Sequence, residues 1–359
     1  MRTTNKFLLA ALTVAALWGM RAGTALALSC IPGPSVTTSG FELGCATPAL
    51  WSVLEFNDKG DTKTSVQFKS GMVGNPTGTA GSTSGMQVGV WGGDLNVEAT
   101  NTSFAGNLVV TDGVYPSAVA TNIDGVKAGT VTVDDALINQ ARNDALSSSS
   151  MIQGYVTAHY SDASTQHFTN GISNSMAPMT INATHSGLNL ITIGNGTAKD
   201  LNLNGLSEML TFTNTLNLSN VSFLINVTGN FKLDNGASIS LASNLSADDV
   251  LFYVGGAVTM DHSSQASGLL FDLDNTVTMN NSATLFGEVI GGANMTFDNG
   301  AKVKNTFTPY GCNADKSGAL TCTIYRTPEP ATLSLFVLGL LPLTFAGWRS
   351  RRRAAVAAR

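Results

Sequence analysis

The chain has 359 residues, of which 12% are charged and 37 are glycine. Eight of its 19 basic side chains lie in two terminal segments, so the body between them sets 11 Lys and Arg against all 24 Asp and Glu, a net charge of −13. Such a surface repels phosphate backbones and anionic headgroups, which excludes nucleic acid as a partner. Divalent cations and neutral sugars remain compatible with it.

The N-terminal segment has the pattern of a secretory signal. Residues 1–20 join a basic head to a short apolar run, and Ala25 and Ala27 supply the small residues that precede cleavage. We expect signal peptidase to cut after Ala27. A buried core helix would need neither the basic head nor the Ala-x-Ala, and a lipoprotein site at Cys30 is disfavoured by Leu28, which stands where a small residue is required.

The first half of the body predicts short strands and one helix. Alternating apolar and polar residues predict strands at 86–90, 95–97 and 107–111. A helix is expected at about 133–147, because acidic residues occupy its first turn and Leu137, Ala141 and Ala145 line one face. Ser147 to Ser150 are expected to end it. Such a helix is expected to cap the end or the side of the β-structure.

The second half of the body repeats itself. After looser strands between 190 and 218, an apolar line, a second apolar line and a turn rich in Asp, Asn, Gly and Ser recur four times between 223 and 303, with Val250–Val254 aligned on Leu269–Leu273. No copy can bury its apolar side alone, whereas stacking copies about 4.8 Å apart buries a continuous core. We therefore expect a mostly β fold, a right-handed β-solenoid. A β-sandwich of unrelated hairpins competes, but turn residues at matching places favour the solenoid.

One column of threonines is a candidate ligand-facing surface. Thr259, Thr278 and Thr296 are expected to stack outward above Lys232, where their hydroxyls could order water and bind ice, or line up along a polysaccharide. The flanking Val, Met and Phe residues point inward, so the pattern supplies one column. Ordinary β-propensity at exposed strand positions also explains threonines there.

The remaining polar residues favour structural roles over chemistry. No nucleophile elbow, zinc helix, phosphate loop or dinucleotide fingerprint occurs, and His262 stands at a turn position that other copies give to Asn. We expect no cofactor. Calcium has weak support from Asp248-Asp249 and from Asp272-x-Asp274, which lack the glycine spacing of calcium loops.

Four cysteines remain after removal of the signal. An even number in an exported chain favours disulfides, and the absence of Cys-x-x-Cys argues against zinc. We expect pairs 30–45 and 312–322, formed by Cys30, Cys45, Cys312 and Cys322.

The C-terminus carries a motif, an apolar span and a basic tail, in that order. Pro328, Glu329 and Pro330 precede an apolar run at 333–348, which is near the lower length limit for a membrane helix and contains Pro342. The basic residues behind it orient the tail inward and the body outward. A plain membrane anchor leaves the Pro-Glu-Pro unexplained. The basic cluster consists of Arg349, Arg351, Arg352 and Arg353.

This C-terminal arrangement resembles the PEP-CTERM sorting signal of Gram-negative bacteria that make extracellular polysaccharide. The resemblance implies processing by an exosortase near the motif. The body between about 51 and 310 is similar to the choice-of-anchor A family through "VGVWGGDLNV", "FLINVTGN", "DVLFYVGG", "GLLF" and "GEVIGG", although the proline usual after the "GLLF" line is missing. A second, weaker similarity is to bacterial ice-binding β-solenoids, which share the "DVLFYVGG" cadence.

Together these patterns predict three parts: a signal peptide at 1–27, an exported solenoid at 28–326 and a sorting signal at 327–359. The expected function is a non-catalytic structural or adhesive protein of the cell surface or extracellular matrix. Its expected partners are signal peptidase and exosortase during export, with transient inner-membrane anchoring, and then extracellular polysaccharide. The alternatives are an ice-binding protein and a polysaccharide-modifying β-helix enzyme. The enzyme would need a carboxylate cluster or a basic pair on one face, and Arg142 and Arg326 are the only arginines of the body.

Overall fold

The computed structural model divides the chain into two units, residues 1–308 and 309–359. It describes residues 33–46, 51–55, 65–68, 71–74, 87–91, 94–97, 102–105, 108–110, 131–173, 176, 178–194, 199–272, 275–291, 294–304, 312–314 and 320–322. The signal peptide with Ala25 and Ala27, Cys30, and everything predicted for 327–359 lie outside these ranges. No helix within them is long and apolar enough to cross a membrane.

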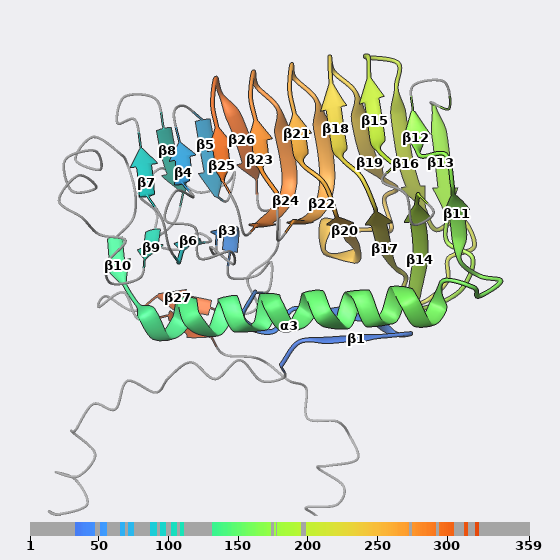
Figure 1. The fold of residues 1–359 in the computed structure, drawn as a ribbon, viewed down its shortest axis with the longest axis horizontal. Coiled ribbons are helices and arrows are strands. Elements are labelled where there is room, and N and C mark those ends of the chain that lie inside the picture. The colour runs from blue at the N-terminus through green and yellow to red at the C-terminus, as the bar shows by residue number, and fades with distance from the viewer. Residues whose placement is uncertain are drawn as a thin grey trace, which may run out of the picture. The chain divides into compact units, whose positions relative to one another are not determined.

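The first unit is a stack of coils built almost entirely from parallel strands (Figure 1). Each coil passes in turn through three faces, and each strand pairs with the equivalent strand of the next coil. This confirms the mostly β prediction and favours the solenoid over a sandwich of hairpins, because a hairpin would pair its own neighbours antiparallel.

The first face is called the covered face, because helix α3 (Asp135–His159) lies along it. Its strands are, in spatial order, β10 (Val131–Val133), β9 (Leu108–Val110), β6 (Gln87–Val90), β3 (Trp51–Glu55), β24 (Thr284–Gly291), β22 (Gln265–Asp272), β20 (Val250–Val254), β17 (Ser222–Val227), β14 (Leu188–Ile193) and β11 (Gln166–Phe168).

The other two faces are named after side chains that they present. The threonine face contains β12 (Ile172–Ser173), β15 (Leu201–Asn204), β18 (Phe231–Asp234), β21 (Val258–Met260), β23 (Val277–Met279), β25 (Met295–Phe297), β4 (Ser65–Phe68) and β7 (Asp94–Val97). The serine face contains β13 (Met179–Asn182), β16 (Met209–Thr213), β19 (Ser238–Leu241), the first halves of β22 and β24, β26 (Ala301–Lys304), β5 (Gly71–Gly74) and β8 (Thr102–Ala105).

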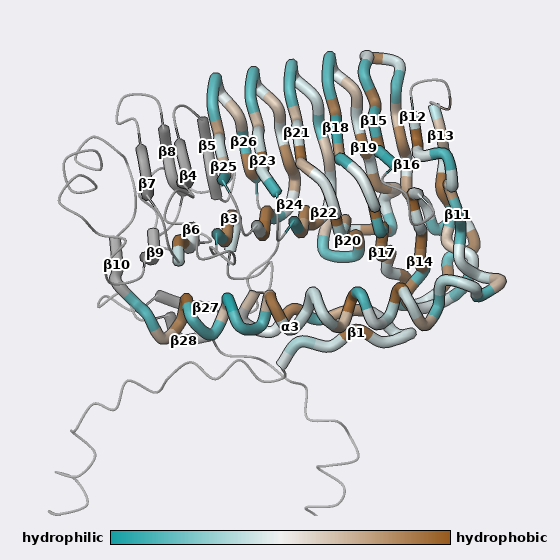
Figure 2. Tube along the Cα trace, viewed as in Figure 1, coloured by the Kyte–Doolittle hydropathy of each residue, from teal (hydrophilic) through white to brown (hydrophobic). Residues whose placement is uncertain are grey.

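Alternation along each strand fills the inside of the tube. Val258 pairs with Val277 and Val277 with Met295, and all three side chains are at most 1% exposed. They belong to one hydrophobic core that runs from coil to coil. Figure 2 shows hydrophilic turns at the outer tips of these coils. Stacking therefore buries what a single coil would leave in water.

The predicted alignment of two copies is wrong by one residue on the covered face. Leu251 pairs with Leu269 and Phe252 with Leu270, whereas the sequence repeat set Phe252 beside Phe271. Because side chains alternate with a period of two, the shift turns Leu270 into the core and Phe271 outward, toward the helix side. The lengths of the corners, which strand patterns do not encode, set this register.

Glycine makes the sharp corners where β22 and β24 cross from the serine face to the covered face. Gly268 and Gly287 have φ values of 138° and 154°, a region that L side chains rarely adopt. A Cβ at Gly287 would collide with the carbonyl oxygen of Gly268. These glycines let one eight-residue strand serve two faces.

The order of coils in space differs from their order in the chain. From β11 the coils follow the sequence to β24–β26, and these last strands then pair with β3, β4 and β5 from the start of the body. Beyond them come β6–β8 and finally β9 and β10. We call the junction between β24–β26 and β3–β5 the seam.

Helix α3 joins the two outer ends of the stack along its side (Figure 1). Asn139 accepts a hydrogen bond from the Trp91 indole after β6, and Gln153 donates one to the Tyr253 hydroxyl on β20. Fourteen helical residues rise about 21 Å, which matches four coil steps of about 4.8 Å between β6 and β20. Of the two expected placements, the helix takes the side.

The helix is also longer than its sequence pattern predicts, since it continues through the serines to His159. Ser148 and Ser149 are both buried, and the Ser149 hydroxyl bonds that of Tyr253 on β20 at 2.8 Å. Packing therefore outweighs the modest helix propensity of serine. At the other end, Asp134 caps the helix by accepting the backbone N–H of Leu137.

A short N-terminal segment completes the cover of this face. It comprises β1 (Ser35–Thr37), β2 (Gly40–Glu42) and η1 (Gly44–Ala46), and η1 and β1 both contact α3. Leu43 and Ala46 are at most 1% exposed. A second apolar layer thus lies outside the tube, between the covered face and these elements.

Candidate functional site

The threonine face carries the predicted column. Thr259 pairs with Lys232 on one side and Thr278 on the other, and Thr278 pairs with Thr296. Val258 and Met260, the strand neighbours of Thr259, are fully buried. The expected column therefore exists as geometry, one residue wide, while its role as a binding site stays a prediction.

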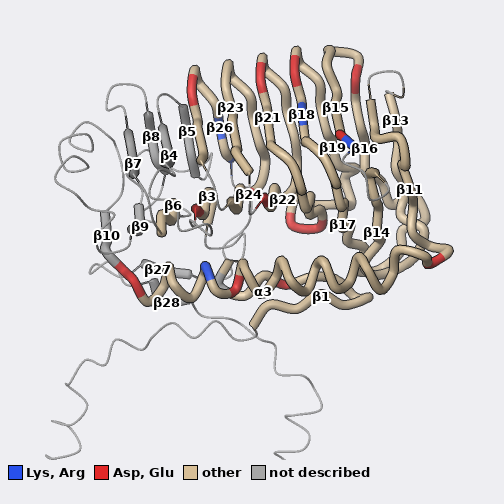
Figure 3. The backbone as a smooth tube through the Cα atoms, viewed as in Figure 1, with Lys and Arg blue, Asp and Glu red and all other residues tan. Residues whose placement is uncertain are grey.

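A second column on the threonine face mixes acidic residues with asparagines. It follows the strand ends and contains Asn204, Asp234, Asp261, Asn280 and Asp298. Figure 3 shows acidic residues recurring at the turns along this edge. A ligand that lies on Thr259 or Thr296 would therefore also meet the carboxylate of Asp261 or Asp298, two residues further along the chain.

These carboxylates belong to a ladder of side-chain hydrogen bonds. The residue after each column position has positive φ: 51° at Asn235, 45° at His262 and 47° at Asn281. Each of the three reaches the column residue of the preceding coil. The bonds are Asn235 to Asn204 at 2.6 Å, His262 to Asp234 at 2.8 Å and Asn281 to Asp261 at 2.7 Å.

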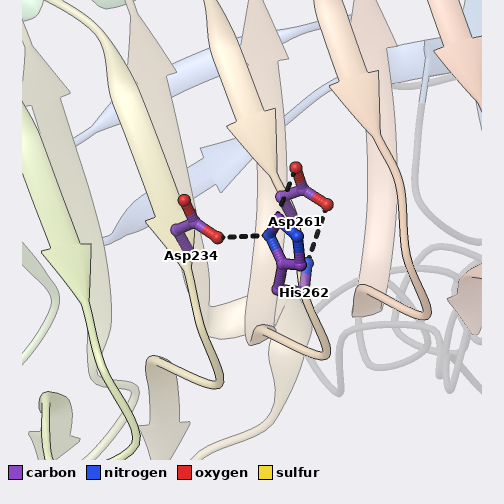
Figure 4. Close-up of side chains that lie close together, drawn as sticks. All are labelled: Asp234, Asp261 and His262. Carbon is purple, nitrogen blue, oxygen red and sulfur yellow. Dashed lines mark hydrogen bonds and ion pairs between the residues drawn. The ribbon is translucent and has the colours of Figure 1, made fainter.

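The ladder accounts for the one cluster of potential metal ligands in the described residues. Asp234, Asp261 and His262 bring their ligand atoms within 4.8 Å of one another (Figure 4). His262 uses Nδ1 toward Asp234, as Asn235 and Asn281 use their amides, and 55% of its side chain is exposed. The cluster is thus a step of the ladder, which supports the predicted turn role of His262.

The serine face carries two columns of uncharged side chains that alternate with core residues, and of these Thr284 is only 8% exposed. Thr211 pairs with Ser240, and Ser267 pairs with Phe286 in the following coils; the parallel column pairs Met209 with Ser238 and Gln265 with Thr284. The intervening residues point into the core. The Thr211 and Ser240 hydroxyls are 3.0 Å apart. Across these four coils neither column contains Asp, Glu, Lys or Arg, and lysines appear only on β26.

Sequence reasoning missed this surface because its residues differ from coil to coil. The signal was present in "MLTF", "SISL" and "QASG", where small polar residues alternate with apolar ones. The Val-Thr-Met repeats are identical from copy to copy, so the predicted ligand-facing column was placed on them instead.

Two of the acids considered for calcium, Asp249 and Asp272, hold local backbone structure, whereas Asp248 is exposed. Asp249 accepts hydrogen bonds from the backbone and hydroxyl of Ser246 at the start of η3 (Ala247–Asp249). Burial, the largest effect, raises the pKa of Asp249. Asp272 is 1% exposed and accepts the backbone N–H of Asn275. Asp274 lies outside the described residues.

The second unit contributes a short antiparallel pair, β27 (Cys312–Ala314) and β28 (Leu320–Cys322). Its register sets Cys312 directly opposite Cys322. This backbone placement is compatible with the predicted 312–322 disulfide, which stays a prediction. The 30–45 pair stays a prediction too, because Cys30 lies outside the described residues.

No known protein family and no curated protein matches the sequence. The solved structures that resemble it include an ice-binding protein of the Antarctic ascomycete Antarctomyces psychrotrophicus, at 17% identity and a TM-score of 0.46 over 75% of this chain and 100% of that one. Another, from an Antarctic biological consortium, gives 15% and 0.46 over 76% and 94%. An ice-binding protein domain of Shewanella frigidimarina gives 14% and 0.37 over 77% and 100%.

The resemblances to the PEP-CTERM and choice-of-anchor A families stay predictions. What the protein binds has to be argued from its own faces.

Proposed function

We propose that this chain is a non-catalytic ice-binding protein that acts through the serine face. The observation that carries the proposal is the pair of uncharged columns across β16, β19, β22 and β24. Parallel strands repeat these side chains about every 4.8 Å along a sheet. Hydroxyl groups in such an array can each hold a water while the methyl and aromatic groups between them keep other water from competing.

Charge decides between the two open faces. A charged group holds its own hydration shell strongly, and stripping that shell costs several kcal/mol. The threonine face would bring Lys232, Asp234 and Asp261 against the ice, whereas the serine columns carry no charge over four coils and meet Lys302 and Lys304 only on the next coil, at β26. The threonine column is therefore the less suitable surface, although its residues match one another better.

The experiment is a thermal hysteresis measurement on the purified protein and two tyrosine variants. Ser240→Tyr raises a bulky ring in the middle of the serine face, so it should abolish most of the hysteresis. Thr278→Tyr makes the same kind of change on the threonine face and should leave the activity intact. Circular dichroism checks that both variants fold. An inactive wild type, or equal activity in all three proteins, would refute the proposal.

We further propose that the chain is exported and sorted to the cell surface or matrix. Support comes from the signal peptide with Ala25 and Ala27, and from the motif, apolar span and basic tail of 327–359. Signal peptidase and exosortase are the proposed processing partners, with a transient inner-membrane stage between them. The four cysteines would then form their two disulfides outside the reducing cytoplasm.

A further inference from the structure

A small groove opens at the corner between the serine face and the covered face. It lies between the turn after β16 and the turn after β19, and its volume is about 210 Å³. Such a groove can form here because these two corners are long, whereas Gly268 and Gly287 make the corresponding corners of later coils tight. The groove is separate from the two hydroxyl columns.

The lining of the groove is entirely uncharged. It consists of Thr213, Asn214, Thr215, Asn217, Ala242, Ser243 and Asn244. Amide and hydroxyl groups can both donate and accept hydrogen bonds, which is what sugar hydroxyls require of a partner. A divalent cation would prefer carboxylates, and a phosphate would prefer basic groups; the lining has neither.

Hydrogen bonds hold the groove in shape before any ligand arrives. Asn214 both donates to and accepts from the backbone of Leu218, at 2.9 Å each. Asn244 donates to the Asn214 carbonyl at 2.9 Å, and Asn182 accepts the backbone N–H of Thr215 at 3.0 Å. A preformed site loses little entropy on binding.

Some polar groups of the lining remain available. Within the described part of the chain the hydroxyls of Thr215 and Ser243 make no hydrogen bond, and both residues are exposed. The lining also includes the apolar side chain of Ala242, beside these polar groups. A sugar ring presents the same combination, hydroxyls at its edge and C–H groups on its face.

We infer that this groove binds one sugar unit of a neutral polysaccharide. Its volume is below the roughly 300 Å³ at which pockets begin to enclose drug-sized ligands, so one ring fits and the polymer continues outside. Such a shallow contact implies weak affinity, with a Kd on the order of 1 mM. The protein would then hold a matrix polymer at a place distinct from its ice-binding face.

The test is an NMR titration of the isotope-labelled protein with cellotriose, mannotriose and chitotriose. At least one of these should cause saturable shifts at 213–217 and 242–244. Thr215→Val and Ser243→Ala each remove one free hydroxyl without touching a structural hydrogen bond. Each should weaken binding by about 5- to 10-fold, the loss expected for one neutral hydrogen bond. Thr278→Val, which removes a hydroxyl on the threonine face, should bind as the wild type does.

Three results would overturn the inference. The first is the absence of saturable shifts with all three sugars, and the second is unchanged affinity in both groove variants. Shifts at these residues with calcium chloride but none with sugar would also overturn it, since they would assign the groove to a cation. Because Ser240→Tyr lies outside the lining, loss of hysteresis in that variant together with normal sugar shifts would separate the two activities.

Discussion

At the scale of single residues, the ladder along the threonine face shows how a turn residue is chosen. Asn235, His262 and Asn281 combine a left-handed backbone with a side chain that reaches the preceding coil. Asn suits both demands, because it tolerates positive φ and carries a short donor. His262 therefore takes the place that asparagine has in the neighbouring coils, and its position is explained without a catalytic or metal-binding role.

His262→Asn should accordingly change the free energy of unfolding by less than about 0.5 kcal/mol. Asn281→Ala should lower it by about 1 to 2 kcal/mol, because it removes a hydrogen bond and places a Cβ-bearing residue without a local donor at positive φ. Urea denaturation of both variants measures the difference. A large loss in His262→Asn would mean that the imidazole has a function that the ladder does not provide.

Glu288 is the other residue whose environment has a measurable consequence. It is fully buried on β24, its register partner is Leu269, and neither carboxylate oxygen has a hydrogen-bond partner in the described structure. Burial raises the pKa of Glu288 well above its ordinary 4.5. The folded protein therefore keeps a proton that the unfolded chain loses once the pH passes about 4.5.

The sign of the pH dependence follows. Because unfolding releases this proton, stability should fall as the pH rises from about 4.5 toward the raised pKa, by at most about 1.4 kcal/mol per pH unit for one group. Glu288→Met, which fills the site with an apolar chain, should lose that part of the slope and be more stable at neutral pH. Denaturation at several pH values tests this. Parallel curves for the two proteins would contradict it.

At the scale of elements, corners matter as much as strands. Gly287 sits at positive φ with the Gly268 carbonyl against the position of a Cβ, so Gly287→Ala should destabilise by several kcal/mol. Gly154 lies in α3 with open space around it, and Gly154→Ala should stabilise by about 0.5 to 1 kcal/mol. The melting temperatures of the two variants compare the same substitution at a crowded corner and on an open helix surface. Equal effects would show that the corner tolerates a side chain.

The sequence supports a prediction of the elements but not of everything that positions them. Alternation located strands such as β6, β7 and β9 within a residue or two, and the Val-Thr-Met repeats gave the correct pairing of Val258 with Val277. The register of Leu251 and the extension of α3 through Ser148 depend on corner lengths and tertiary packing, which local patterns do not contain. The serine columns escaped notice for a related reason, since they share chemistry but not identity.

At the scale of the whole molecule, the proposed location of the protein rests on its two terminal segments. If the C-terminal segment is a sorting signal, deletion of 327–359 should release the protein into the medium or periplasm. Replacing Pro328, Glu329 and Pro330 with alanine should trap it in the inner membrane. Fractionation with immunoblotting distinguishes these locations. An unchanged distribution of the alanine variant would refute the motif's role.

The right-handed winding of the solenoid also stays a prediction. It is favoured because crossovers between parallel strands of one sheet are nearly always right-handed.

The seam has a consequence for how the molecule is made. During synthesis β3 emerges early, while β24, its neighbour in the finished stack, emerges near the end of the body. The edge of β3 that pairs with β24 therefore stays exposed until almost the whole body has been synthesised. A strand edge that stays unpaired for long slows folding and can pair with another molecule instead. The newly made chain should consequently depend on dilution or on chaperones until its last coil closes the stack.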